Sequence, residues 1–223
     1  KNKYSLTEIK AESNDLIISS PLVEINEKKD LFLIKGKILT SKRNFSKDNL
    51  IKIFTSSLEN LDIKKATFSS ENDVSFEVNK KLKLDNLTLN SKINLNELVV
   101  KNNFINLKKY LPNLNEVINF RNHEIIVNYD KDKINIKGNG KILVKENFDN
   151  INYEVKKNDN EITFDTKINI KNNRLLINFL DYEKKENKDA SILIKGNYKK
   201  NHKTNFDLIS FIEKRNTILL KKL

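Results

Sequence analysis

Between Lys80 and Val100, apolar and polar residues alternate almost without interruption. Successive side chains of a β-strand point to opposite faces of a sheet, so this pattern gives one Leu/Ile face and one Lys/Asn/Thr face. Leu84 and Leu87 have opposite parity, and we therefore expect separate strands on the two sides of Asp85–Asn86, with a further break near Asn90. The run predicts a β-sheet with one apolar surface and one polar surface.

The same alternation returns along most of the chain, with charged turns between the runs. We expect three short strands before Thr40, further strands that lead into the Lys80–Val100 run, and a series of strands from Ile125 to about Leu208. Asp207–Leu223 is expected to be helical or frayed. The pattern therefore predicts a mainly β chain.

Two segments have helical spacing instead of alternation. Near residues 47–59, apolar residues recur at helical intervals from Leu50 onward. Near residues 104–119, the leucines also follow a helical spacing, but Pro112 lies inside it and lacks a backbone donor. We expect a helix at the first position and, at the second, a short helix followed by a separate turn or helix that begins at Pro112.

The tripeptide Ile-Lys-Gly occurs in three expected strands and ends at Gly36, Gly138 and Gly196. Chance is one explanation in a chain rich in Ile and Lys, and relief of a bend in a wide sheet is the other. At Gly138-Asn139-Gly140 a tight hairpin turn competes with a continuous bent strand. The alternation keeps its phase on both sides of these glycines, which favours the continuous strand.

The composition is basic, with a formal net charge of +12, but it carries no signature of nucleic-acid binding. The excess is nearly all Lys, which lies on strand after strand beside Asn and Ile. Arginines and aromatic residues, which read phosphates and bases, are not clustered. A basic nucleic-acid-binding β domain is therefore disfavoured, and we expect no nucleic-acid partner.

Catalytic and metal-binding motifs are absent from the sequence. There is no Cys, and the two histidines, His123 and His202, have no second ligand at metal-binding spacing, so we expect both to be solvated. No Gly-rich loop precedes a helix, no Ser has a nucleophile-elbow context, and carboxylates such as Asp130 and Asp165 lie among lysines. We expect neither enzyme activity nor a metal or cofactor.

The chain begins at Lys1 without a leader sequence, and no apolar run approaches the roughly 20 residues of a transmembrane helix. We expect a processed form or a segment of a longer protein. Any membrane anchor would then lie outside these residues.

The apolar surface of the expected sheet is too wide for two short helices to cover, because about a dozen strands at roughly 4.8 Å spacing would span about 55–60 Å. Such a sheet must close on itself, pair with another sheet, or use its uncovered face. The first two cases give a structural or adhesive module that acts through loops and edge strands. A sheet that uses its uncovered face would instead form a trough that holds lipid chains.

The runs Asn72–Leu95 and Ile136–Lys199 resemble the periplasmic part of AsmA-like proteins, particularly the YhdP type. In that family a G-x-G strand is followed by a d-i-x-Y-x-v strand, an f-x-x-x-l-x-l strand, a connecting segment and a strand that ends in Lys-Gly. The positions that match are Gly138, Gly140, Ile151, Tyr153, Val155, Phe164, Ile168, Ile170, Lys195 and Gly196. The Leu111-Pro112 step is also similar.

The resemblance implies an inner-membrane-anchored protein whose periplasmic body is a taco-shaped β-groove, an extended and coiled antiparallel sheet that carries phospholipid between the inner and outer membranes. Residues 1–223 would be one segment of that groove, at the periplasmic face of the inner membrane. The family has no catalytic residues to carry over. The in-phase apolar residues are the candidates for contact with phospholipid acyl chains, with the inward parity left open: Leu82, Leu84, Leu87, Leu89, Ile134, Ile136, Ile142, Val144, Ile162, Phe164, Ile168, Ile170, Ile192 and Ile194.

Overall fold

The structure is a computed structural model, and it describes residues 2–13, 16–54, 61–101, 115–143, 147–177, 181–199, 204–214 and 216–221. The prediction of a mainly β chain is confirmed, because most of these residues belong to one large antiparallel sheet. That sheet has twelve strands, and a separate sheet has two.

The first seven elements are β1 (Lys3–Ser13), β2 (Leu16–Lys28), β3 (Leu31–Phe45), α1 (Lys47–Phe54), β4 (Ile63–Asn79), β5 (Leu84–Lys101) and β6 (Val117–Asp130). The next four are β7 (Lys133–Leu143), β8 (Phe148–Asn158), β9 (Glu161–Ile170) and β10 (Leu175–Ile177). The last four are β11 (Tyr182–Lys184), β12 (Ala190–Lys199), β13 (Asn205–Glu213) and β14 (Asn216–Lys221).

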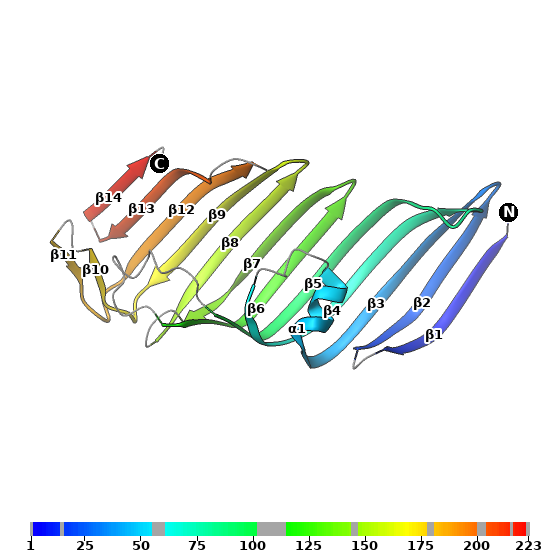
Figure 1. Cartoon of the computed structure of the whole chain (residues 1–223), viewed down its shortest axis with the longest axis horizontal. Coiled ribbons are helices and arrows are strands. Elements are labelled where there is room, and N and C mark those ends of the chain that lie inside the picture. Colours follow the sequence, from blue (N-terminus) through cyan, green and yellow to red (C-terminus); the bar gives the residue numbers. More distant parts are fainter. Residues whose placement is uncertain are drawn as a thin grey trace.

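The strands of the large sheet lie side by side in chain order from β1 to β14, with β10 and β11 set apart (Figure 1). Each strand is antiparallel to its neighbour in the chain, and β9 pairs directly with β12. Within the described residues, β1 and β14 each have a partner strand on one side only. The sheet is therefore open and does not close into a barrel.

The register aligns apolar residues of successive strands into rows on one face. One row consists of Val127, Ile136, Val155, Phe164, Gly196 and Phe206. The next row along the strands projects from the opposite face and consists of Asn128, Asn135, Lys156, Thr163, Asn197 and Asn205. We call these two surfaces the apolar face and the polar face of the sheet.

A bulge corrects the expected strand break within the central alternating run. β5 is continuous through both Asn86 and Asn90, so neither expected break occurs. The φ of 50° at Asn86 places that residue in the left-handed region. The register between β4 and β5 shifts at this point, so that Leu84 lies opposite Val78 and Leu89 lies opposite Val74. One extra residue reverses the parity of a strand, and the leucines on both sides of the bulge therefore share the apolar face.

Parts of both expected helical segments lie outside the described residues, and the first segment agrees with the expectation where it is described. α1 ends at Phe54, and residues 55–60, the end of the segment expected near 47–59, lie outside the described residues. Residues 102–114 also lie outside them, so most of the helix expected near residues 104–119 is not described. The expectation of helix at the end of this segment is wrong, because Val117 and Ile118 pair with β5 and begin β6.

Two further expectations concern the strands of the second half. Residues 205–213 and 216–221 form β13 and β14, so the expectation of a helical or frayed Asp207–Leu223 is wrong. Gly138 and Gly140 both lie inside β7, which confirms a continuous strand rather than a hairpin turn.

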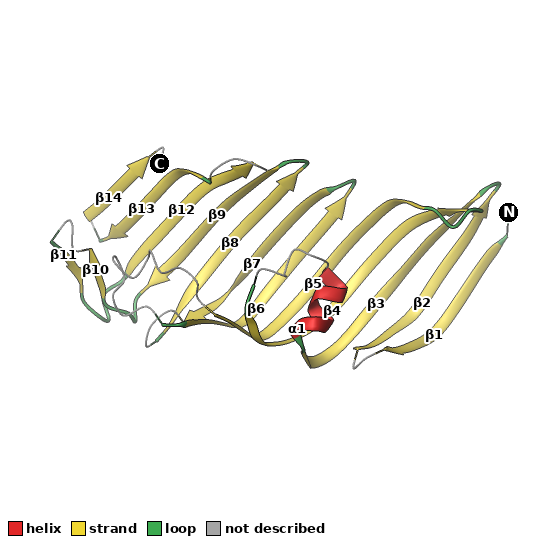
Figure 2. Cartoon of the chain, viewed as in Figure 1, coloured by secondary structure: helices red, strands yellow, loops and turns green. Residues whose placement is uncertain are grey.

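One buried cluster lies where α1 crosses the apolar face of β3, β4 and β5 (Figure 2). Ser46 accepts a hydrogen bond from the backbone of Asn49 and caps the helix. Leu50 then packs against the sheet, where the rings of Phe45 and Phe68 stack with their centroids 4.2 Å apart. The remaining buried members of the cluster are Ile63, Ala66 and Leu95.

Candidate functional site: the open apolar face

The apolar face is covered at two places in the described structure: by α1 over β3–β5, and by the β10–β11 hairpin over the last strands. Between these places the apolar residues of β6–β9 are mostly half-buried, shielded by their neighbours on the sheet. The described residues form no second sheet of similar size that faces them. A mutual core between two large sheets is therefore not part of the described structure.

Most of the nominated lipid-contacting residues share the apolar face. Leu82 does not, because it lies in the turn before β5 and is 84% exposed. Val144 lies outside the described residues. The residues brought together on the apolar face are Leu84, Leu87, Leu89, Ile134, Ile136, Ile142, Ile162, Phe164, Ile168, Ile170, Ile192 and Ile194.

Both histidines were expected to be solvated. His202 lies outside the described residues, and for His123 the expectation is wrong. Its side chain is 1% exposed and lies on the apolar face, against Phe120 and Tyr153. The ring atom Nε2 lies 3.0 Å from the carbonyl oxygen of Lys141 and must donate to it. Nδ1 then accepts the hydroxyl proton of Tyr153 across 3.3 Å.

Burial sets the protonation of this pair. It lowers the pKa of His123, against the opposing effect of the hydrogen bond to Lys141, and it raises the pKa of the Tyr153 hydroxyl to about 12. Both groups are therefore neutral at pH 7, so they add no charge to the apolar face. The sequence signal for this site is Gly140, which leaves room for the ring; a Cβ there would lie 2.3 Å from His123.

A second polar group on the apolar face joins β3, β4 and β5. Ser91 donates to Oδ1 of Asn72 across 2.6 Å. The Asn72 amide donates to Ser70 Oγ and to the carbonyl oxygen of Ile38. These buried atoms satisfy one another, so the network joins strands and presents no unpaired group to a ligand.

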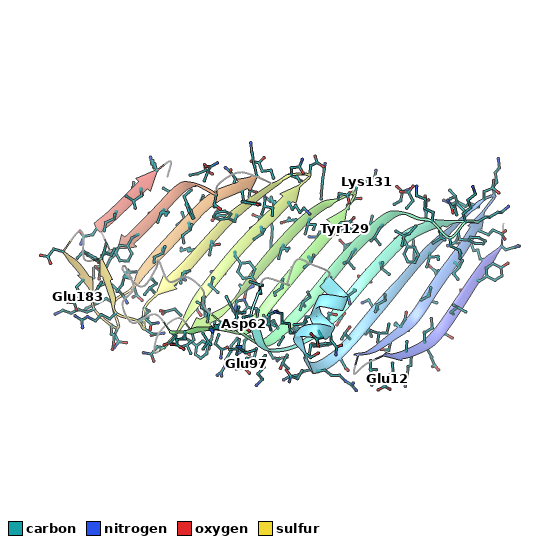
Figure 3. The ribbon with its side chains drawn as sticks, viewed as in Figure 1. Glu12, Asp62, Glu97, Tyr129, Lys131 and Glu183 are labelled. Atoms are coloured by element: carbon teal, nitrogen blue, oxygen red, sulfur yellow. The ribbon has the colours of Figure 1, made fainter. Side chains whose placement is uncertain are left out.

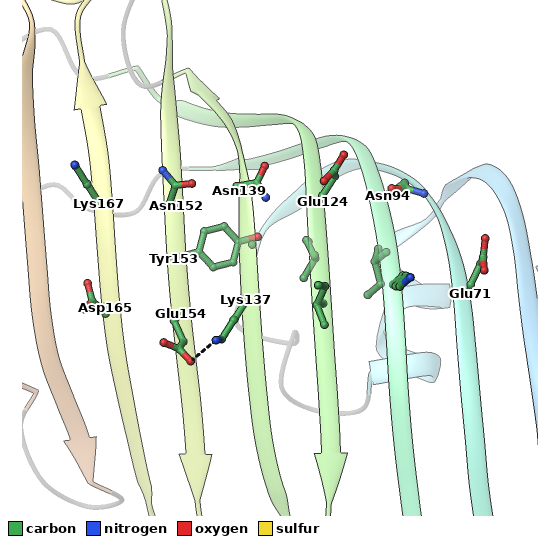
Figure 4. Close-up of a pocket in the computed structure, with 15 residues that line it drawn as sticks. Glu71, Asn94, Glu124, Lys137, Asn139, Asn152, Tyr153, Glu154, Asp165 and Lys167 are labelled. Atoms are coloured by element: carbon green, nitrogen blue, oxygen red, sulfur yellow. Dashed lines mark ion pairs between the residues drawn. The ribbon is translucent and has the colours of Figure 1, made fainter.

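The polar face carries a cavity of about 640 Å³ that crosses β5–β9 (Figure 4). One wall consists of side chains in a single row: Asn94, Glu124, Asn139, Asn152 and Lys167. On the other wall, Lys137 is paired with Glu154 at 3.4 Å, and Asp165 with Lys195 at 2.6 Å. The two signs of charge alternate, which is typical of a solvated strand surface and gives no single-sign field for an ionic ligand.

The turns that end the strands are also mixed in charge. Lys80 forms an ion pair of 2.7 Å with Asp30, which links the β2–β3 and β4–β5 turns. At the end of β6, where Figure 3 labels Tyr129 near Lys131 of the following turn, the Tyr129 hydroxyl donates to Asp132 of that turn. At this edge of the sheet, Lys80 and the Tyr129 hydroxyl therefore each lie beside a carboxylate.

Within the described residues there is no group of three or more His, Cys, Asp or Glu side chains that could hold a metal ion. No helix in that part of the chain has the length and apolar character needed to cross a membrane. Comparisons of the chain with protein-family models, with curated protein sequences and with solved structures found no match.

Proposed function

We propose that this chain binds phospholipid by its acyl chains, which lie along the apolar face of the sheet. The observation that carries the proposal is the register: rows of apolar side chains run across the strands, and no second large sheet of described residues faces them. Large contiguous apolar surfaces mark interaction sites in soluble proteins. Binding of this kind needs no catalytic residue.

The physical benefit of such a surface is largest for lipid transfer. At roughly 0.8 kcal/mol per CH₂, moving a sixteen-carbon chain into water costs on the order of 12 kcal/mol. An apolar face that continues from strand to strand removes most of that barrier along its length. The chain would therefore act as a non-enzymatic segment of a path along which phospholipid moves.

The proposal includes the context implied by the AsmA-like resemblance. The sheet would be part of a longer, taco-shaped groove at the periplasmic face of the inner membrane, anchored by a segment outside these residues. Phospholipid would pass between the inner and outer membranes along it. The lipid head groups would remain in water at the open side of the groove.

Phe164 provides the sharpest test. It lies in the middle of β9 on the apolar face, where its ring packs edge-on against Phe206 at 6.0 Å. Phe164→Asp places a charge among the acyl chains. Thr163→Asp is the matched control, because it adds the same charge one residue away on the exposed polar face.

Native mass spectrometry after incubation with phosphatidylethanolamine and phosphatidylglycerol vesicles measures the bound lipid. We expect phospholipid adducts on the native chain and on Thr163→Asp, and far fewer on a folded Phe164→Asp variant, with circular dichroism as the check of folding. A lipid-free native chain, or equal loading of all three proteins, would refute the proposal.

A structural or adhesive β module is the second candidate, favoured by the free edges of β1 and β14 in the described structure. Unpaired backbone groups at a sheet edge can accept a strand from another chain. This candidate predicts a lipid-free mass together with self-association that increases with protein concentration in sedimentation experiments. The lipid proposal predicts the opposite combination.

A further inference from the structure

The β10–β11 hairpin lies on the apolar face without joining the large sheet. Its strands, Leu175–Ile177 and Tyr182–Lys184, pair with each other and form a separate two-stranded sheet. The hairpin follows β9 in the chain and lies beside β12–β14 at the C-terminal end of the large sheet (Figure 1). It is therefore held there by side-chain contacts rather than by a backbone ladder.

Those contacts are mainly apolar. Leu175 of the hairpin and Phe211 of β13 are each 5% exposed and belong to one buried cluster. The Tyr182 ring meets the Phe211 ring edge-on at 5.3 Å. Partly buried residues of the same cluster are Ile170, Ile177, Ile192 and Ile218. Two of the nominated lipid-contacting residues, Ile170 and Ile192, thus pack against this cluster.

The base of the hairpin is fastened by buried polar groups. Lys184 is 0% exposed, and its Nζ donates to the carbonyl oxygens of Lys171 and Asn173 at 2.8 and 2.7 Å. Asp149 of β8 accepts the backbone N–H groups of Lys171 and Asn172. These bonds fix the segment that leads into the hairpin, so the hairpin has a rigid attachment at one end.

The Tyr182 hydroxyl donates to the carboxylate of Glu213 on β13. This bond ties the hairpin to the large sheet at a distance from the Asp149 attachment. Burial, and then the bond to Glu213, raise the pKa of the Tyr182 hydroxyl well above its ordinary value. The hydroxyl therefore remains protonated, and able to donate, throughout the physiological pH range.

We propose that the β10–β11 hairpin is a displaceable cap on the apolar face: a phospholipid acyl chain replaces it over Ile192 and Phe211, and it swings about the Asp149 attachment. The inference rests on the proposed function, since the competing ligand is the acyl chain. An isolated two-stranded hairpin is marginal, and an acyl chain can reproduce apolar contacts but not a backbone ladder. The cap would keep this end of the face covered until lipid arrives.

The chain contains no Trp, so a single introduced Trp is an unambiguous reporter. Phe211→Trp reports on the covered end, and Phe164→Trp reports on the open part of the same face. Vesicles of dibrominated-acyl phosphatidylcholine quench a Trp that touches the acyl chain. We expect quenching of both reporters, with a higher lipid concentration required at Phe211→Trp than at Phe164→Trp.

Adding Tyr182→Phe removes the bond to Glu213 and keeps the ring. Loss of a hydrogen bond to a charged group should shift the half-quenching concentration at Phe211→Trp roughly ten- to a hundredfold lower, and leave Phe164→Trp unchanged. Quenching of Phe164→Trp alone, or no shift with Tyr182→Phe, overturns the cap while the proposed function stands. No quenching of either reporter overturns both.

Hydrogen exchange of the unmodified chain gives an independent measurement. With unlabelled phosphatidylcholine vesicles, the amides of Leu175–Ile177 should lose protection, whereas those of Lys171 and Asn172 should keep it because they remain bonded to Asp149. Unchanged protection of the hairpin in the presence of bound lipid would mean that the hairpin is a permanent wall.

Discussion

Gly140→Ala tests whether the β6–β7 region depends on the close approach of His123 to a bare backbone. A Cβ at this position would lie 2.3 Å from Cδ2 and 2.4 Å from Cγ of the His123 ring. The φ of Gly140 is not positive, so alanine fits the backbone and the penalty arises from the side-chain collision alone. The ring would have to move by about 1 Å to restore ordinary van der Waals contact.

His123 has little freedom to make that move. Its Nε2 is bonded to the Lys141 carbonyl oxygen at 3.0 Å, and its Nδ1 to the Tyr153 hydroxyl at 3.3 Å. Overpacking costs about 1–3 kcal/mol, and a buried group left without its partner costs about 1–3 kcal/mol more. We expect Gly140→Ala to lower the free energy of unfolding by about 2–6 kcal/mol, with a drop in Tm of about 2–4 °C per kcal/mol.

Thermal and urea unfolding, followed by circular dichroism, measure this loss. Gly36→Ala is the control, because its Cβ would lie 3.0 Å from a methyl group of Val23, and we expect it to cost less than about 1 kcal/mol. Combining Gly140→Ala with His123→Ala should recover at least about 1 kcal/mol relative to the sum of the single variants. A cost below 1 kcal/mol for Gly140→Ala, or strict additivity in the cycle, would refute the reasoning.

Two further predictions concern charged groups. The Lys65 ammonium lies 2.7 Å from the Glu97 carboxylate (labelled in Figure 3) and, with Asn119 and Arg121, lowers the pKa of Glu97 from 4.5 to about 2. The ionised carboxylate therefore stabilises the folded state above pH 4.5, and this contribution is lost as the pH falls toward 2. Glu97→Gln should therefore lower stability by about 1–2 kcal/mol at pH 7 and by almost nothing near pH 2 in urea unfolding; an equal loss at both would contradict this. Lys184→Met leaves two buried carbonyl groups without donors and should cost about 2–4 kcal/mol in the same assay, whereas the exposed neighbour Lys185→Met should be neutral.

The division of the sheet into an apolar and a polar face could be predicted because period-two alternation is a local property. Each strand carries its own pattern, and the register then needs only to bring like faces together. The strands β7, β8 and β9 show this directly, since Ile136, Val155 and Phe164 fall into one row. Most of the nominated residues share a face for the same reason.

The positions that alternation misjudged are those where a single residue changes the phase. Asn86 adds a residue to β5, so leucines of opposite parity reach the same face. A register shift between β12 and β13 leaves Asp207 without a partner on β12. The extra residue interrupts the alternation of apolar and polar residues in Asn205–Glu213, so the sequence did not predict a strand there. Bulges depend on the neighbouring strand, and a period read within one strand cannot locate them.

Burial of His123 and the β10–β11 hairpin could not be predicted for a different reason. The histidine is buried by groups that come from β7 and β8, including Gly140 and Tyr153. The hairpin strands have three residues each, which is too short for a period to appear. Both features are set by contacts between segments that are far apart in the sequence.

The same non-local contacts bear on the choice between the two proposed functions. An adhesive module would use the edges of β1 and β14, and its apolar face would serve only as core. The described structure instead covers that face locally, by α1 near β4 and by a hairpin that lies over β12 and β13 without joining the sheet. Covers of this kind protect an apolar surface from water and leave the strands between them accessible. A face that is covered at two places, with the strands between them shielded only by neighbouring side chains, is suited to a ligand that is itself long and apolar.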